Sequence, residues 1–288
     1  VTNVSGDTAT FTPSTTGMAG VETTVSPDSL TLGDGETAEF TVTFAQSSAP
    51  LNAYTGGQLT WTNAGDGTVV RIPMVVRPVA LAAPASVSSN GEPVSYPVGF
   101  GYTGAFSATG RGLDAATTTP GTVAQDPDQT FDPSDPTGTV AIPVIIPAGT
   151  TYQRFALFDA DVAPTADLDL YVYQGATLVG TSATGTSAEE VNFNFAAPTG
   201  APIALTVYVH GWGVPSGTSP FVLHDWSIPA TQAGNVTVTA PTSATTGQTG
   251  TVDLTFSGLA PATKYLGSVV YAGAAGLPAP TIVSVNTP

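Results

Sequence analysis

The chain has 288 residues, of which 41% are hydrophobic and only 9% charged, so it is long enough for two or three domains with real cores. Five Lys and Arg against 21 Asp and Glu give a formal net charge of −16, which argues against nucleic-acid partners and against anionic membrane surfaces. Cysteine is absent, which excludes disulfides, zinc–thiolate sites and thiol nucleophiles, and no apolar run reaches the roughly 18 residues of a membrane-spanning helix.

The first part of the chain alternates apolar and polar residues with the period of two that is typical of β-strands. Pro73 interrupts one such segment and predicts an edge strand or a bulge there. We expect a sandwich-sized domain over residues 1–80, followed by a Pro- and Ala-rich linker at 77–86. The strand candidates of this domain are residues 8–12, 21–25, 38–44, the segment QLTWT, and residues 69–76.

A second domain is expected over residues 85–230, where short strands are separated by turns as in a sandwich or jelly roll. The stretch 111–138 is rich in Thr, Pro and Asp and is predicted to be a long acidic loop outside the core. The strand candidates are residues 94–99, 103–109, 139–146, 152–158, 167–173, 177–182, 190–195, 203–210 and 220–227.

The last expected domain covers residues 231–288, with strand candidates at 235–239, 250–256, 265–271 and 281–285. Fewer than 60 residues make a marginal free-standing domain, so we expect it to pack on its neighbour. A faint internal similarity links residues 98–113 with residues 254–277. The predicted fold class is all-β, with tandem β-sandwich domains of fibronectin-III or immunoglobulin-like and jelly-roll type.

Nucleophilic catalysis would need a base beside a Ser, and the only histidines are His210 and His224. Both lie in apolar strand candidates, and we interpret them as partly buried strand residues. Asp225 follows His224 directly, and adjacent strand residues point to opposite faces, which disfavours a triad built on this pair. No GxSxG, P-loop, dinucleotide or HExxH motif occurs. No catalytic residues are therefore predicted.

Two pairs of acidic residues have the spacing of a calcium site. Asp159 and Asp161 flank one residue, as do Asp167 and Asp169, and in a strand such side chains share a face. Ca²⁺ takes six to eight oxygen ligands, and backbone carbonyls of the turn at Pro164 can complete such a set. The alternative is a solvated acidic edge that discourages aggregation.

Two other groups of side chains are weaker binding candidates. The loop acids can bind a cation, but their Pro-interrupted spacing fits no EF-hand loop; they are Asp126, Asp128, Asp132 and Asp135. Aromatic side chains can form a surface for a polymer or a protein, namely Tyr171, Tyr173 and Trp212. Ordinary sandwich packing explains the aromatic residues as well.

Residues 1–77 resemble the fibronectin-III-like domain that follows the catalytic domain in many subtilisin-like serine proteases. The matching segments occur in the family's order: VTNV at 1–4, VETTVSPDSLTLGDGETAEFTVTF at 21–44, and GGQLTWTNAGDGTVVRIPMVV at 56–76. That family has a further strand before VTNV. Its absence here leads us to expect that the first strand is truncated and that the chain is a fragment or a processed C-terminal piece.

Residues 139–227 resemble a bacterial pre-peptidase C-terminal domain, through ADLDLYVY and the closing strands IALTVYVH and FVLHDWSI. Such domains are calcium-associated β-sandwiches of secreted proteases. The resemblance therefore implies bound Ca²⁺ and places Asp167 and Asp169 in the acidic segment, with Asp159 and Asp161 just upstream. The three-module order is similar to the tail of large secreted subtilisin-like proteases.

The resemblance implies a protease parent and no protease in this chain. HGW at 210–212 and GTSPF at 217–221 are only partly similar to the family's His and Ser segments, and they lie too close together for that fold. A second partial match to the Ser segment, GTSAE at 185–189, precedes both histidines. We expect a secreted, noncatalytic C-terminal region that stabilises the enzyme and positions it on a protein substrate or cell-surface polymer. The alternative is a structural or adhesive cell-envelope protein without a protease domain. The expected partners are thus the parent's catalytic domain and such a substrate or polymer.

Overall fold

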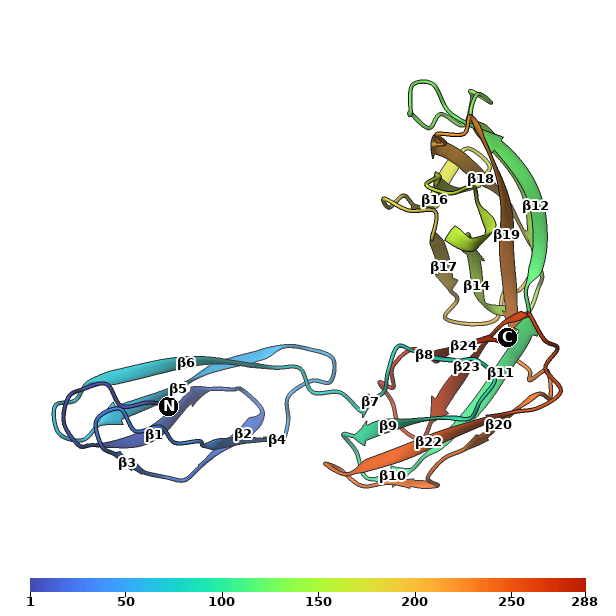
Figure 1. The fold of residues 1–288 in the computed structure, drawn as a ribbon. Helices are drawn as coiled ribbons and strands as arrows, with labels where there is room; N and C mark the ends of the chain where they lie inside the picture. Colours follow the sequence, from blue (N-terminus) through green and yellow to red (C-terminus); the bar gives the residue numbers. More distant parts are fainter.

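The structure is a computed structural model that describes all 288 residues, and it is almost entirely β. Its one helical segment is the 3-10 turn η1 (Asp159–Asp161), and no helix is long and apolar enough to cross a membrane. The strands pair antiparallel everywhere except between β8 and β24. They form three sandwich domains (Figure 1), which confirms the predicted all-β class of tandem sandwiches.

The first domain packs the sheet β3-β1-β5-β6 against the paired strands β2 and β4. Its core contains Leu59 and Trp61, which are each 1% exposed, and Met74 of β6. Because β6 is an edge strand, Pro73 removes no hydrogen bond from the sheet interior. The strands are β1 (Ala9–Gly17), β2 (Val21–Ser26), β3 (Leu30–Leu32), β4 (Thr41–Gln46), β5 (Thr55–Asn63) and β6 (Val69–Val76).

The second domain packs the sheet β11-β23-β24-β8 against the sheet β20-β22-β9-β7, with the short pair β10–β21 at one end. Its core is formed by alternate residues of both sheets, including Val98, Val252 and Val285. The strands are β7 (Leu81–Ala82), β8 (Ser86–Ser89), β9 (Val94–Phe100), β10 (Gly104–Ala105), β11 (Ser107–Ala115), β20 (Val236–Thr239), β21 (Ser243–Ala244), β22 (Thr249–Phe256), β23 (Lys264–Ala272) and β24 (Thr281–Asn286).

This second domain differs from the expected division into residues 85–230 and 231–288. The C-terminal strands build no sheet of their own: β22 pairs with β9, and β23 pairs with β11. The faintly similar stretches 98–113 and 254–277 are direct partners in one sheet, where β11 pairs with β23. Strand alternation identifies a strand and its buried face but not its partner, which explains the wrong boundary.

The third domain is inserted between β11 and β20, and it packs the sheet β12-β19-β14-β17 against the sheet β13-β18-β15-β16. Its core includes Phe155, Leu170, Val207 and Phe221, each 1% exposed or less. The strands are β12 (Thr117–Ala124), β13 (Thr139–Ile146), β14 (Thr150–Ala156), β15 (Asp167–Gln174), β16 (Thr177–Ser182), β17 (Glu190–Asn194), β18 (Ile203–Gly213) and β19 (Thr218–Pro229).

The first half of the stretch predicted as a long loop, 111–138, is almost entirely strand. It contains the end of β11 and all of β12, which leaves residues 125–138 as the acidic loop. Pro120 and Gly121 suggest a turn, but β12 is an edge strand and accepts proline. Gly121 is required by packing, because a Cβ there would lie 2.3 Å from the ring of Phe221.

The predicted linker 77–86 is also partly structured, since Leu81 of β7 is 2% exposed and belongs to the core of the second domain. The first domain therefore joins the second through a shorter connection, and in Figure 1 it extends away from the other two. Across this junction the side-chain amide of Asn52 donates a hydrogen bond to the carbonyl of Gly276 at 3.3 Å.

The second and third domains meet where the chain crosses between them twice. A small buried cluster spans the junction, with Tyr152, Trp226 and Ile228 from the third domain and Leu266 from the second. The indole of Trp226 donates to the carbonyl of Lys264 at 3.3 Å. The ammonium of Lys264 lies 4.2 Å from the centre of the Phe158 ring, a cation–π contact.

Candidate functional site

The four predicted calcium ligands lie near one another in the chain but in two different backbone settings. Asp159 and Asp161 form η1, not a strand, so the shared-face argument fails for them. Asp167 and Asp169 begin β15, but a bulge lies between them in the pairing with β18. Asp169 is 4% exposed, whereas Asp167 remains partly accessible.

A buried imidazole links two carboxylates at this end of the domain. Nε2 of His210 lies 2.8 Å from Oδ2 of Asp126, and Nδ1 lies 3.4 Å from Oδ2 of Asp169. His210 is 0% exposed, and both ring nitrogens donate only when the ring is protonated. Burial disfavours that charge, but the hydrogen bonds and charges of Asp169 and Asp126 outweigh it and raise the pKa of His210.

Asp126, predicted from the sequence only as a loop acid, is the closer carboxylate partner of His210. It is 5% exposed, and although burial acts to raise its pKa, the bonds from His210 and from the amide of Asp128 lower the net value. Its backbone amide also donates to the carbonyl of Gly211 at 2.9 Å. The start of the acidic loop is therefore fastened to β18 by charge and by backbone.

The other loop acids have a structural use. Each accepts a hydrogen bond at Oδ1 from the backbone amide two residues later, as in an Asx-turn. The pairs are Asp128 with Thr130 at 3.0 Å, Asp132 with Ser134 at 2.8 Å, and Asp135 with Thr137 at 2.9 Å. The Pro-interrupted acidic spacing thus specifies successive turns of the loop.

The second histidine is also held by a carboxylate. Nε2 of His224 lies 2.9 Å from Oδ2 of Asp161, which fastens η1 to β19. The rings of Phe158 and Trp226 lie against the imidazole, with centroid distances of 5.0 and 5.9 Å. Asp225 instead accepts a hydrogen bond from Gln153 at 2.8 Å, so the adjacent strand residues face different surroundings, as predicted.

Asp167 is the one predicted ligand with an unsatisfied oxygen. Its Oδ1 is buried and has no hydrogen-bond partner. Burial raises the pKa of Asp167, and the nearby charges of Asp169, Glu189 and Asp159 raise it further. Glu189 is 1% exposed and accepts bonds at Oε1 from the amide and hydroxyl of Thr184, both at 2.6 Å. The surrounding sequence, TSAEE at 186–190, carries no signal that Glu189 is buried rather than solvated.

The structure does not bring the four predicted ligands together as one cage. Asp161 and Asp169 are paired with the two histidines, while Asp159 and Asp167 remain close enough to interact electrostatically. No group of three or more acidic or histidine side chains is arranged to hold a metal ion. Among the four, Asp167 and Asp159 are the residues without a histidine partner.

The two serines in the protease-like segments are buried structural residues. Ser187 is 0% exposed; its hydroxyl donates to the carbonyl of Ala166 and accepts from the amide of Leu168, both at 2.9 Å. Ser219, also 0% exposed, donates to the carbonyl of Pro220 and accepts from the amide of Ala163, both at 2.8 Å. Neither hydroxyl is placed to attack a substrate.

The aromatic candidates are not one exposed surface. Tyr171 lies under Phe131 of the acidic loop, with parallel rings 3.8 Å apart, and Phe131 also covers His210. Burial, and then the charge of Asp169, raises the pKa of Tyr171 to about 12. Tyr173 packs edge-on against Tyr208, and only Trp212, at 44%, is well exposed. Packing therefore explains two of the three residues.

Comparison with solved structures gives low overall similarity. "Secreted serine protease VesC from Vibrio cholerae" matches 80% of this chain and 46% of its own, at 10% identity and a TM-score of 0.21. "The structure of the M60 catalytic domain with the CBM51-1 and CBM51-2 domains from Clostridium perfringens ZmpB" matches 97% of this chain and 39% of its own, at 10% identity and a TM-score of 0.24. The chain thus spans less than half the length of either protein.

Sequence comparison identifies one domain. A search of curated protein sequences found no match. Residues 1–76 match the family model of a fibronectin type-III domain, which agrees with the first sandwich and with the resemblance of its motifs.

Proposed function

We propose that the chain is a noncatalytic C-terminal accessory region of a secreted subtilisin-like serine endopeptidase, which it stabilises and helps to bind protein substrate or the cell surface. The observation that carries this proposal is the fibronectin type-III domain at residues 1–76, whose motifs follow the order seen behind subtilisin-like catalytic domains. Two further sandwich domains continue from it, as in the tails of such proteases.

The histidine and serine side chains, the candidates for hydrolysis, support a noncatalytic role. Both histidines are held by carboxylates, and the serines of the GTS segments bind backbone groups in the interior. A general base must reach the proton that it removes, and the buried imidazole of His210, between two carboxylates, has no free nitrogen for that task. Nδ1 of His224 has no partner, but it is buried and no serine hydroxyl is bonded to it. The chemistry is therefore assigned to the parent's catalytic domain.

The test is to read the coding sequence upstream of Val1 and to express the encoded protein with and without residues 1–288. We expect a subtilisin-like catalytic domain there, a lower melting temperature after removal of this region, and a larger loss of activity on insoluble than on soluble substrate. An upstream region without a catalytic domain would favour the structural or adhesive alternative. Unchanged stability and substrate range would contradict the accessory role.

We also propose a Ca²⁺ site in the third domain, now centred on Asp167. The unpartnered Oδ1 of Asp167 and the neighbouring charge of Asp159 suit a cation that prefers oxygen ligands. Asp161 and Asp169 would contribute only by leaving their histidine partners. Bound Ca²⁺ would remove the mutual repulsion of these carboxylates, and its test is the last prediction below.

A further inference from the structure

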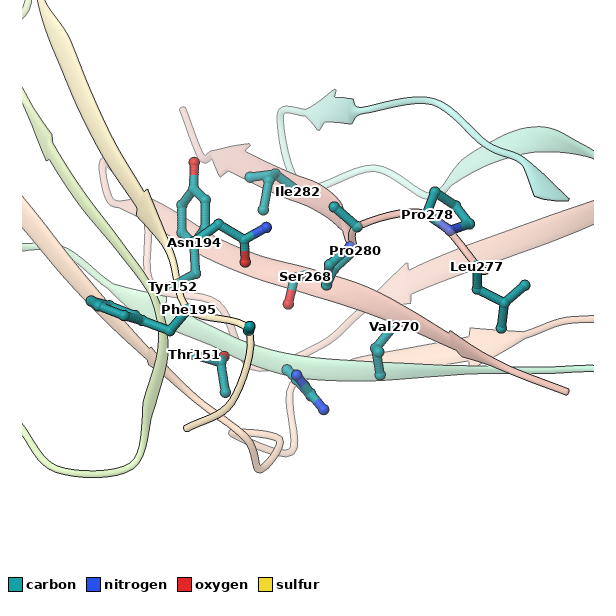
Figure 2. A pocket seen from close by; sticks show the side chains of 13 residues that line it. Thr151, Tyr152, Asn194, Phe195, Ser268, Val270, Leu277, Pro278, Pro280 and Ile282 are labelled. Carbon is teal, nitrogen blue, oxygen red and sulfur yellow. The ribbon is translucent and has the colours of Figure 1, made fainter. Parts of the chain in front are cut away.

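A cleft of about 320 Å³ lies where the third domain meets the second. Its floor is the outer face of the sheet β11-β23-β24-β8, and one wall comes from β14 and the end of β17. The segment 277–280, Leu-Pro-Ala-Pro, forms the rim. Figure 2 shows the Asn194 side chain pointing toward Ser268 from the third domain, with Leu277 and Pro278 on the far side.

The floor carries a defined row of side chains. Ser268 of β23 lies directly opposite Arg111 of β11 on one side and Ile282 of β24 on the other. Residues in register across neighbouring strands share a face, so a guanidinium, a hydroxyl and an aliphatic group stand side by side. A bulge between Gly112 and Asp114 follows Arg111 immediately, a device that changes where a strand residue points.

Arg111 is unusual among the five basic residues. Arg154 pairs with Glu190 at 2.9 Å, and Lys264 lies over the ring of Phe158. Arg111 is half-buried in the cleft yet makes no ion pair or side-chain hydrogen bond, in a chain with 21 acidic residues. Partial burial of a charge without a partner is unfavourable, which points to an anion supplied from outside. Arg71 also lacks a partner, but it is exposed and solvated.

We propose that this cleft binds a carboxylate attached to an apolar group, such as the free C-terminus of a short peptide. The planar guanidinium of Arg111 matches a carboxylate with two parallel hydrogen bonds, and the Ser268 hydroxyl and Asn194 amide add neutral donors. Ile282 and the Leu-Pro rim receive the apolar group. The volume is at the lower end of the ~300–1,000 Å³ typical of small-ligand pockets, which suits a fragment of one to three residues.

The test uses acetyl-Phe-Leu with a free carboxylate, its C-terminal amide, and acetyl-Phe-Asp-amide, titrated into the full chain by NMR and calorimetry. We expect saturable shifts at the amides of Thr151, Asn194 and Ser268 with the free acid. The neutral amide should bind at least about tenfold more weakly, because it lacks the charge-assisted bonds. Equal binding of the Asp peptide would identify carboxylate in general as the ligand, and weaker binding would identify the peptide C-terminus.

The matched variants are Arg111→Gln and Arg71→Gln, which change the net charge equally. Arg111→Gln should weaken binding of the free-acid peptide at least about tenfold, whereas Arg71→Gln should leave its affinity unchanged. If Arg111→Gln lowers the melting temperature, Ser268→Leu provides a second variant that fills the cleft from its floor and should block binding. No saturable shifts at 20 mM peptide, or equal binding by wild type and a folded Arg111→Gln, would overturn the proposal.

Discussion

Nε2 of His210 lies 2.8 Å from Oδ2 of Asp126, and this contact joins residues that are 84 positions apart. The histidine is completely buried in β18. Its other ring nitrogen, Nδ1, lies 3.4 Å from Oδ2 of Asp169. The acidic loop begins at this contact, and Phe131 of the loop closes over it. The imidazole of His210 therefore joins two buried carboxylates, compensates their charge when it is protonated, and anchors the loop.

The stability of the third domain should depend on the charge of His210. The pKa of His210 is raised in the folded state, so its contribution is fully present below the ordinary histidine pKa and is lost as pH rises through the folded value. The pKa of Asp126 is lowered in the folded state, so its contribution to stability is present above the ordinary carboxyl pKa. That contribution is lost as pH falls through the folded pKa. Denaturant unfolding across this range should show a plateau between the two titrations.

Replacing His210 tests its contacts with Asp126 and Asp169. His210→Ala leaves two buried carboxylates without their shared partner, and where the imidazole is protonated such a loss costs about 3–5 kcal/mol. The variant should also lose the fall in stability that wild type shows at high pH. His224→Ala is the comparison, since His224 pairs with the more accessible Asp161. A His210→Ala protein as stable as wild type, with an unchanged pH profile, would contradict the assignment.

Much of the strand content could be predicted from the sequence, because alternation has a clear period. Residues 69–76, 139–146 and 177–182 form strands with the expected bounds. Partner choice could not be predicted in this way. The pairing of β9 with β22 crosses the inserted third domain, and nothing in the period of two specifies which distant strand completes a sheet.

The candidate site was predicted in composition but not in geometry. Asp159 and Asp161 were expected on one strand face, yet they form a 3-10 turn, where that periodicity does not apply. The ionic role of Asp126 depends on the loop folding back to His210, which the local sequence does not encode. Asp169 illustrates both points, since the strand was correct and its histidine partner was not foreseen.

The discontinuous second domain predicts the outcome of two deletions. Removing residues 231–288 takes β22 and β23 from between their neighbours, so the second domain should unfold while the third keeps its core. Replacing residues 116–230 by a short Gly-Ser linker should instead leave the second domain folded. Hydrogen exchange or limited proteolysis of each variant measures this. A protected second domain after loss of 231–288 would contradict the strand pairing.

Gly121 should tolerate no side chain. A Cβ at this position would lie within 2.9 Å of three atoms of the Phe221 ring, and Phe221 is a core residue at 1% exposure. Gly121→Ala should therefore destabilise the third domain by about 1–3 kcal/mol in urea unfolding, the usual cost of overpacking. The control is Gly185→Ala, where a Cβ meets nothing within 4 Å and stability should change little. Equal stability of the two variants would show that β12 can move away.

The last prediction concerns Asp167 and calcium. The pKa of Asp167 is raised in the folded state, so folding favours its protonated form, and that contribution is lost as pH rises through the folded value. At neutral pH the ionised group therefore destabilises the third domain when no cation is bound. In the presence of a chelator, Asp167→Asn should have a higher melting temperature than wild type, because the amide removes the repulsion from Asp169, Glu189 and Asp159.

Calcium should reverse this order. At a free concentration ten times a given dissociation constant, binding to the folded state adds about 1.4 kcal/mol, which raises the melting temperature of wild type by a few degrees. Asp167→Asn should lose that rise. Asp135→Asn is the matched control, because its side-chain oxygen still accepts the bond from Thr137 and it should keep the full calcium response. A full calcium response in Asp167→Asn would show that the cation does not bind at Asp167. A response lost only on replacing Asp126 or Asp128 would place the cation in the acidic loop instead.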